Sequence, residues 1–117
     1  MNKPDKQYTL SLVHILQGFS TIFCLENSRI LEEGLIDLSS LEKSIKLNDK
    51  IFNKVLEDGD IDFSLKQAKK AYNQVLSYFQ IIKSHYNNSV ANKRQFNLLV
   101  EFKKQLEEQI EMLEALV

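Results

Sequence analysis

The sequence has little of what marks several common protein classes. Its single cysteine, Cys24, excludes a disulfide framework and favours a reducing compartment. Three glycines and one proline are too few for an all-β protein built on many tight turns. No apolar run approaches the length of a membrane span, and the first residues lack the pattern of a signal peptide. We therefore expect a cytoplasmic protein that makes no contact with the membrane.

Residues that could carry chemistry are also scarce. The two histidines, His14 and His85, belong to no His-x-x-x-His, Glu-x-x-His or Cys-x-x-Cys spacing, so nothing predicts a metal site. Cys24 and His14 lie on one expected helix, where ten residues separate them by roughly 15 Å, too far for a nucleophile and its base. Glycine-rich phosphate loops and nucleophile elbows are missing. The sequence predicts a protein that is not an enzyme and holds no cofactor.

Helical periodicity is what the chain does have. Between Leu65 and Tyr86, apolar residues recur at alternating steps of three and four, with no glycine or proline between them. This spacing is typical of a helix of roughly 30 Å that keeps one seam against other helices, because it cannot bury its stripe alone. The seam is predicted at Leu65, Ala68, Tyr72, Val75, Phe79, Ile82 and Tyr86.

Three other segments repeat the pattern. We expect helices from about Asp5 to Glu33, from near Asp37 or Ser39 to about Leu56, and from roughly Val90 to Val117. The predicted stripes are Tyr8, Leu12, Ile15, Leu16, Phe19, Ile22, Phe23 and Ile30 in the first, Leu38, Leu41, Ile45, Phe52, Val55 and Leu56 in the second, and Phe96, Leu99, Phe102, Leu106, Ile110, Leu113 and Val117 in the last.

The breaks between these segments are short. Gly34 is placed to end the first helix, and Asp58-Gly59-Asp60 is the clearest turn. Ser39 with Glu42, and Ser64 with Gln67, have the spacing of capping boxes that open helices. The prediction is an all-α single domain over residues 1–117, an antiparallel bundle of four helices whose sequential members are neighbours. The alternative has three long helices, in which the first two segments form one helix that is only bent at Gly34.

Three residues interrupt the apolar stripes. Gly18 permits close approach of another helix or has no role. Glu26 is interpreted as a carboxylate at the rim of the core that reaches solvent, with a buried, paired carboxylate as the alternative. Asn48 falls between Ile45 and Phe52. It either fixes the register of the helices from within the seam or lies exposed after a small rotation.

Charge is unevenly distributed although the net charge is only −1. Region 63–104 contains eight lysines or arginines and one acid, Glu101, while the compensating acids lie in the flanks. The favoured interpretation is that neighbouring basic and acidic helices partly neutralise each other. The other is a basic face for an acidic partner. Aromatic residues among these lysines also suit nucleic-acid contact, but core packing explains them better.

One stretch resembles a known family. From Glu26-Asn27 the chain reads Glu-Asn-x-x-Ile-Leu-x-x-Gly-Leu-Ile-Asp-Leu-x-x-Leu, followed by Lys46. This resembles the helical hairpin of FlgN-type flagellar export chaperones over about a quarter of the chain, although the expected Gly-Asp break reads Gly34-Leu35-Ile36-Asp37 here. The resemblance implies a cytoplasmic chaperone that holds the amphipathic C-terminal segment of a secreted subunit in a helical groove.

The leading functional hypothesis is a small non-catalytic protein that binds an amphipathic helix of a partner, such as an export chaperone or adaptor. The candidate contact residues lie on the last helix, where completing the core is the alternative explanation. Other hypotheses are a self-assembling bundle, such as a homodimer, and a regulator contacting nucleic acid through region 63–104. The candidate partner-binding residues are Leu99, Phe102, Leu106, Ile110 and Leu113.

Overall fold

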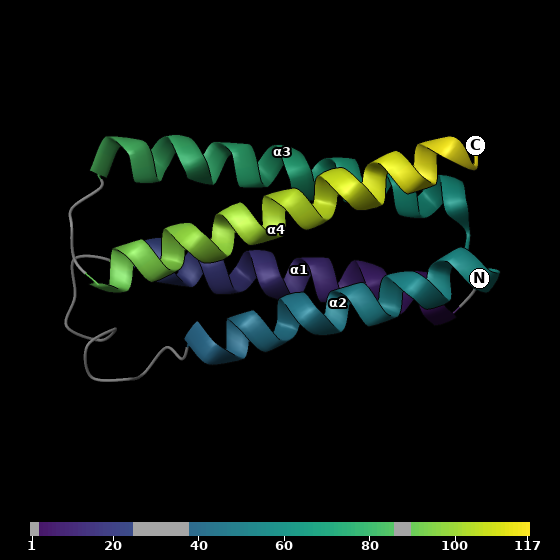
Figure 1. Ribbon diagram of the computed structural model, residues 1–117, viewed down its shortest axis with the longest axis horizontal. Coiled ribbons are helices and arrows are strands. Elements are labelled where there is room, and N and C mark those ends of the chain that lie inside the picture. The colour runs from purple at the N-terminus through teal and green to yellow at the C-terminus, as the bar shows by residue number, and fades with distance from the viewer. Residues whose placement is uncertain (1–2, 25–37, 86–89) are drawn as a thin grey trace.

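Four helices account for the secondary structure of the computed structural model, which describes residues 3–24, 38–85 and 90–117 (Figure 1). Side chains are described for residues 5–22, 38–84 and 93–117. The helices are α1 (Lys3–Cys24), α2 (Leu38–Asp58), α3 (Ile61–His85) and α4 (Val90–Ala115). They align along the long axis of a molecule that measures 43 × 24 × 17 Å. The predicted all-α bundle of four helices is confirmed.

Helices α1 and α2 pack side by side, as do α3 and α4. Each pair is antiparallel: residue 8 lies beside residue 52 and residue 11 beside residue 48, while residue 72 lies beside 107 and residue 79 beside 96. Because α1 and α2 lie alongside each other, the alternative of one bent rod is wrong. The two antiparallel pairs then pack together, with α1 against α3 and α2 against α4.

The prediction that all sequential helices are neighbours holds for two of the three connections. Helices α2 and α3 are antiparallel and joined by a tight turn, yet they lie diagonally across the bundle and make few contacts. Contacts such as Ser11 with Asn48 and Ile45 with Gln105 assign α2 to a place between α1 and α4 instead. The turn, the first residues of α1 and the end of α4 share one end of the molecule (Figure 1).

The core fills the space between all four helices. Aromatic rings occupy its centre: Phe19 of α1 stacks on Phe102 of α4 at 6.1 Å between ring centroids and lies 6.4 Å from Tyr78 of α3. Gly18 meets Leu41 of α2, since a Cβ there would lie 3.0 Å from Leu41 Cδ1, so the glycine serves close helix approach. The buried apolar residues are Tyr8, Leu12, Ile15, Phe19, Ile22, Leu38, Leu41, Ile45, Phe52, Val55, Leu65, Ala68, Ala71, Val75, Tyr78, Ile82, Leu98, Leu99, Phe102, Leu106 and Leu113.

The predicted seam of α3 is rotated in part. Ala71 and Tyr78 are fully buried, whereas Tyr72 and Phe79 are only partly covered because they face α4 at the edge of the core. In α4, Phe96 and Val117 were predicted in the seam and are exposed. Val117 lies beyond the last helical residue, Ala115, where nothing in the described chain covers it.

The start of α3 also differs from the prediction. Asp60, not Ser64, caps the helix: its Oδ1 accepts a hydrogen bond from the Phe63 backbone N–H at 3.0 Å. Ser64 lies one turn inside and donates its hydroxyl to Asp5 Oδ1 at 2.8 Å. The predicted positions of Phe23, Ile30, Glu26, Gly34 and Tyr86, and the last part of the predicted first helix, lie outside the described side chains or residues.

Candidate functional site

A strip of apolar side chains faces solvent where α3 and α4 run beside each other. Phe79 and Phe96 meet edge to face, with ring centroids 5.6 Å apart and planes at 87°. The antiparallel register places Leu76 and Val100 one turn further along the same seam. Phe79 is partly buried, while Leu76, Phe96 and Val100 remain 38%, 36% and 44% exposed. We call these four residues the α3–α4 strip.

The strip borders a hollow of about 800 Å³. Its walls are mostly hydrocarbon, with one amide and one ammonium group at the edge. Among the described residues it is lined by Leu76, Phe79, Gln80, Ile82, Lys83 and Phe96. An exposed apolar surface with aromatic side chains and a polar rim is the usual chemistry of a site that receives another protein.

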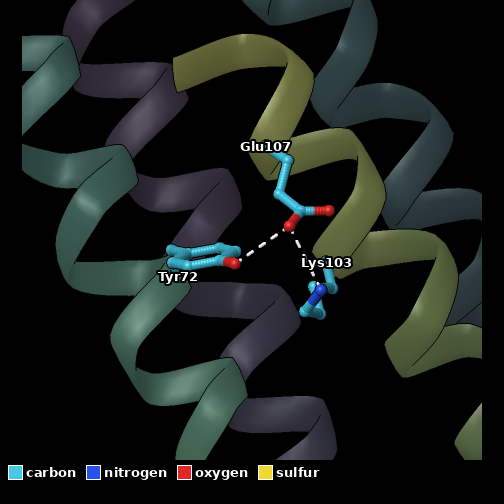
Figure 2. Close-up of polar contacts among 3 residues, drawn as sticks. All are labelled: Tyr72, Lys103 and Glu107. Carbon is cyan, nitrogen blue, oxygen red and sulfur yellow. Dashed lines mark hydrogen bonds and ion pairs between the residues drawn. The ribbon is translucent and has the colours of Figure 1, made fainter. Parts of the chain in front are cut away.

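One end of the strip is closed by a polar cluster of three residues (Figure 2). The Glu107 carboxylate lies between Tyr72 of α3 and Lys103 of α4, as the dashed lines mark. Its Oε2 accepts hydrogen bonds from the Tyr72 hydroxyl at 2.9 Å and from Lys103 Nζ at 3.1 Å. The ammonium of Lys103 also lies 5.9 Å from the centroid of the Tyr72 ring. The cluster joins α3 to α4 at the surface.

These contacts shift the pKa values of all three groups. Hydrogen bonds from Lys103 and Tyr72 lower the pKa of the Glu107 carboxyl, because both donors stabilise its charged form. The same bonds raise the pKa of Lys103 and of Tyr72, since each proton is held against a carboxylate. Near neutral pH the cluster therefore holds one ammonium and one carboxylate, fixed beside an aromatic ring.

The basic residues of region 63–104 are partly neutralised. Lys66 lies 3.3 Å from Asp62, and Lys69 lies 3.3 Å from Glu114 across the α3–α4 seam. Lys103 also pairs with Glu107 within α4, so of these three pairs only Lys69–Glu114 joins neighbouring helices as the favoured interpretation predicted. Lys83, Lys93 and Lys104 are exposed on the face that carries the strip. The strip therefore has a rim of mainly positive charge.

The sequence-predicted contact residues lie elsewhere on α4. Leu99, Phe102, Leu106 and Leu113 are completely buried against the other helices, and Ile110 packs partly buried beside them. Their side chains point into the core, whereas Phe96 and Val100 lie on the side of α4 next to α3 and solvent. Their role in binding a partner stays a prediction, which in this packing requires α4 to separate from the bundle.

A buried polar network inside the bundle was only partly predicted. Asn48 Nδ2 donates to Gln105 Oε1 at 2.8 Å and to Gln109 Oε1 at 3.3 Å, and its Oδ1 accepts from the Ser11 hydroxyl at 2.8 Å. Tyr8 donates its hydroxyl to Gln109 Oε1 at 2.8 Å, and burial raises the pKa of Tyr8 so that it stays a donor. The seam position predicted for Asn48 is confirmed, since it is fully buried.

Further hollows lie on the surface of the described part of the chain. One of about 390 Å³ lies between α1 and α3. Its polar lining includes Gln17, Gln67 and Gln74, and its apolar lining includes Ala71. Another of about 260 Å³ lies between α1 and α2 beside the exposed Leu10 and Leu47. Neither has an aromatic pair exposed as Phe79 and Phe96 are.

The described residues contain no group of three histidine, cysteine, aspartate or glutamate side chains placed to hold a metal ion. His14 is exposed on α1, while the side chains of His85 and Cys24 lie outside the described part. None of the helices in the described chain is long and apolar enough to cross a membrane.

Fold and surface together define a four-helix bundle with an exposed apolar strip and a basic rim. Comparison of the chain with protein-family models, with curated proteins and with solved structures finds no match. The motif that resembles FlgN-type chaperones is described only from Leu38 to Lys46, so that resemblance stays a prediction.

Proposed function

We propose that this protein is a non-catalytic, cytoplasmic binding protein that holds an amphipathic helix of a partner protein against the α3–α4 strip. The observation that carries the proposal is the strip itself. Leu76, Phe96 and Val100 keep more than a third of their surface in water although they adjoin the core. An amphipathic helix of a partner that packs in the groove between α3 and α4 would cover these side chains and add a fifth helix to the bundle.

Helix packing geometry favours this kind of guest. The seam between two antiparallel helices is a shallow groove, and side chains spaced i, i+3, i+4 and i+7 on a third helix interdigitate with such a surface. Phe79 and Phe96 supply the large apolar contacts that usually contribute most of the binding energy in such sites. The role of an export chaperone or adaptor, which the FlgN-type resemblance implies, is one case of this proposal.

A selection from a displayed library of helical peptides tests the proposal. The library fixes leucines at i, i+3, i+4 and i+7 and randomises the other positions, and the full chain is the target. We expect recovered peptides to bind wild type and to bind the double variant Leu76→Ser/Val100→Ser at least tenfold more weakly.

The matched control is Leu10→Ser/Leu47→Ser, which removes two exposed leucines from the α1–α2 face. It should bind the recovered peptides as wild type does. Recovery of no peptide above a library without leucines would overturn the proposal, and so would equal loss of binding in both double variants.

A further inference from the structure

The charged side chains around the strip indicate which composition of partner helix would bind it best. On α3, Lys83 follows Leu76 and Phe79 on the same face and lines the hollow. On α4, Lys93 precedes Phe96 by three residues, and Lys104 follows Val100 by four, so both lie beside the strip. All three lysines are exposed. Cationic groups thus border the apolar surface at both ends.

One acid beside the strip, Glu107, is already engaged. Glu107 accepts hydrogen bonds from Lys103 and Tyr72, so its charge is directed toward those partners. Glu101 and Glu108, three residues before and four after Lys104, lie beside that lysine and offset part of its charge, whereas no acid lies within four residues of Lys83 or Lys93 in the sequence. A helix lying on the strip would therefore meet an excess of positive charge along its edges.

From this arrangement we infer that the α3–α4 strip receives an acidic amphipathic helix, one with Asp or Glu flanking its apolar stripe. This inference rests on the proposed function and specifies its partner. Carboxylates beside the apolar stripe would lie near Lys83, Lys93 and Lys104, whose ammonium groups attract them. Exposed charges of this kind act mainly on the association rate and on the choice of partner.

The same charges disfavour the other occupants. Two copies of this chain joined strip to strip would bring lysine rims together, and like charges across an interface oppose pairing. Nucleic acid would be attracted by the lysines, but bases could stack only on the partly exposed Phe96 ring, because Leu76 and Val100 are aliphatic. An acidic helix satisfies both the apolar surface and its cationic rim.

The composition of the peptides recovered in the library selection gives the first test. We expect Asp and Glu to be enriched severalfold over Lys and Arg at the randomised positions that flank the leucines. Binding of a recovered peptide should weaken by about tenfold between 50 and 300 mM salt, because exposed charges are screened over this range. Equal recovery of acidic and basic peptides would overturn the inference while leaving the proposed function standing, whereas recovery of no peptide would overturn both.

Charge reversal gives the second test. The double variant Lys83→Glu/Lys104→Glu should bind a recovered acidic peptide at least tenfold more weakly, and should bind the twin peptide with every Asp and Glu replaced by Lys more tightly than wild type does. The control Lys43→Glu/Lys50→Glu reverses two exposed charges on α2 and should leave both affinities unchanged. The same loss in both variants would contradict the inference, since it would reflect net charge alone.

Two further measurements distinguish the acidic helix from the two other candidate occupants of the strip, a second copy of the chain and nucleic acid. A stable dimer in sedimentation analysis that Val100→Glu converts to monomer would assign the strip to a second copy of the chain and overturn the inference. Binding of a 20-nucleotide DNA that competes with the acidic peptide and tolerates Leu76→Ser/Val100→Ser would assign the rim to nucleic acid and likewise overturn it. We expect a monomer, and no competing DNA at 150 mM salt.

Discussion

The hydroxyl of Tyr8 and the side-chain oxygen of Gln109 form a 2.8 Å hydrogen bond within the core, although 101 positions separate them in the sequence. Gln109 Oε1 also accepts from Asn48, so α1, α2 and α4 meet at one polar point. An apolar core tolerates small shifts of one helix along another, whereas hydrogen bonds between fixed partners do not. The network therefore selects one register for these three helices.

Replacing Asn48 tests that role. Asn48→Leu keeps the branched shape of the side chain but removes the partner of the Ser11 hydroxyl and of Gln105 Oε1, while Gln109 Oε1 keeps only Tyr8, so we expect a loss of about 1–3 kcal/mol in the free energy of unfolding. Urea denaturation measures it. Asn53→Leu, at an exposed position on α2, should change stability by less than about 0.5 kcal/mol. A stabilised Asn48→Leu protein would show that the network costs more than it contributes.

The capping of α3 by α1 gives another prediction. Asp5, buried at the start of α1, accepts hydrogen bonds from the Asp60 backbone N–H and the Ser64 hydroxyl at the start of α3. Gly59 allows this approach, because a Cβ there would lie 2.7 Å from Asp5 Oδ1. Asp5→Ala removes the carboxylate and should lower the unfolding free energy by about 1–2 kcal/mol, measured by thermal or urea unfolding.

The control for Asp5 is Asp49→Ala, which removes an exposed carboxylate from α2. It should be close to neutral. If both variants lost the same stability, the effect of Asp5 would come from net charge and not from its place at the end of α3.

The Tyr72–Lys103–Glu107 cluster predicts a pH dependence. The folded-state pKa of Glu107 is lowered below its ordinary value of 4.5, so its contribution to stability is present above that pH and lost as pH falls through the folded value. The pKa of Tyr72 is raised above 10.0 and that of Lys103 above 10.5, so their contribution is lost at strongly alkaline pH. The contribution should be small, since the groups are exposed and screened.

Glu107→Gln isolates this effect. The stability difference between wild type and the variant should form a plateau from about pH 6 to 9 and shrink below about pH 4.5, when followed by urea unfolding across that range. High salt should reduce the plateau. A difference that stayed constant down to pH 3 would mean that the carboxylate charge does not contribute.

The periodicity of apolar residues was enough to predict four helices and most of the core. The place of α2 was not predictable from it, because short turns indicate antiparallel packing but do not fix which helix lies diagonal. That choice depends on contacts between distant residues, such as Asn48 with Gln105. Gln105 and Gln109 were overlooked because they stand among glutamates, although their spacing of four places both on one face of the helix.

The sequence placed the candidate contact residues on the inner side of α4, whereas the proposed strip uses the edge of α4 beside α3. Sequence spacing identifies the largest apolar stripe, and in a bundle that stripe is used for the core, as Leu99 and Leu106 are. The α3–α4 strip combines Phe96 and Val100 with residues of α3, so it exists only once the two helices pack in register. Its lysine rim, in contrast, lies within the basic region 63–104 that the sequence had already indicated.

Chemical-shift mapping by NMR, with a recovered acidic peptide titrated into the full chain, tests the binding proposal most directly. We predict that the largest shifts occur at Leu76, Phe79, Phe96 and Val100, with none at Leu10 or Leu47. Shifts centred on α1 and α2 would contradict the proposal. Shifts spread through Leu99, Phe102 and Leu106 would also contradict it, since they would show that the peptide opens the bundle and binds the inner side of α4.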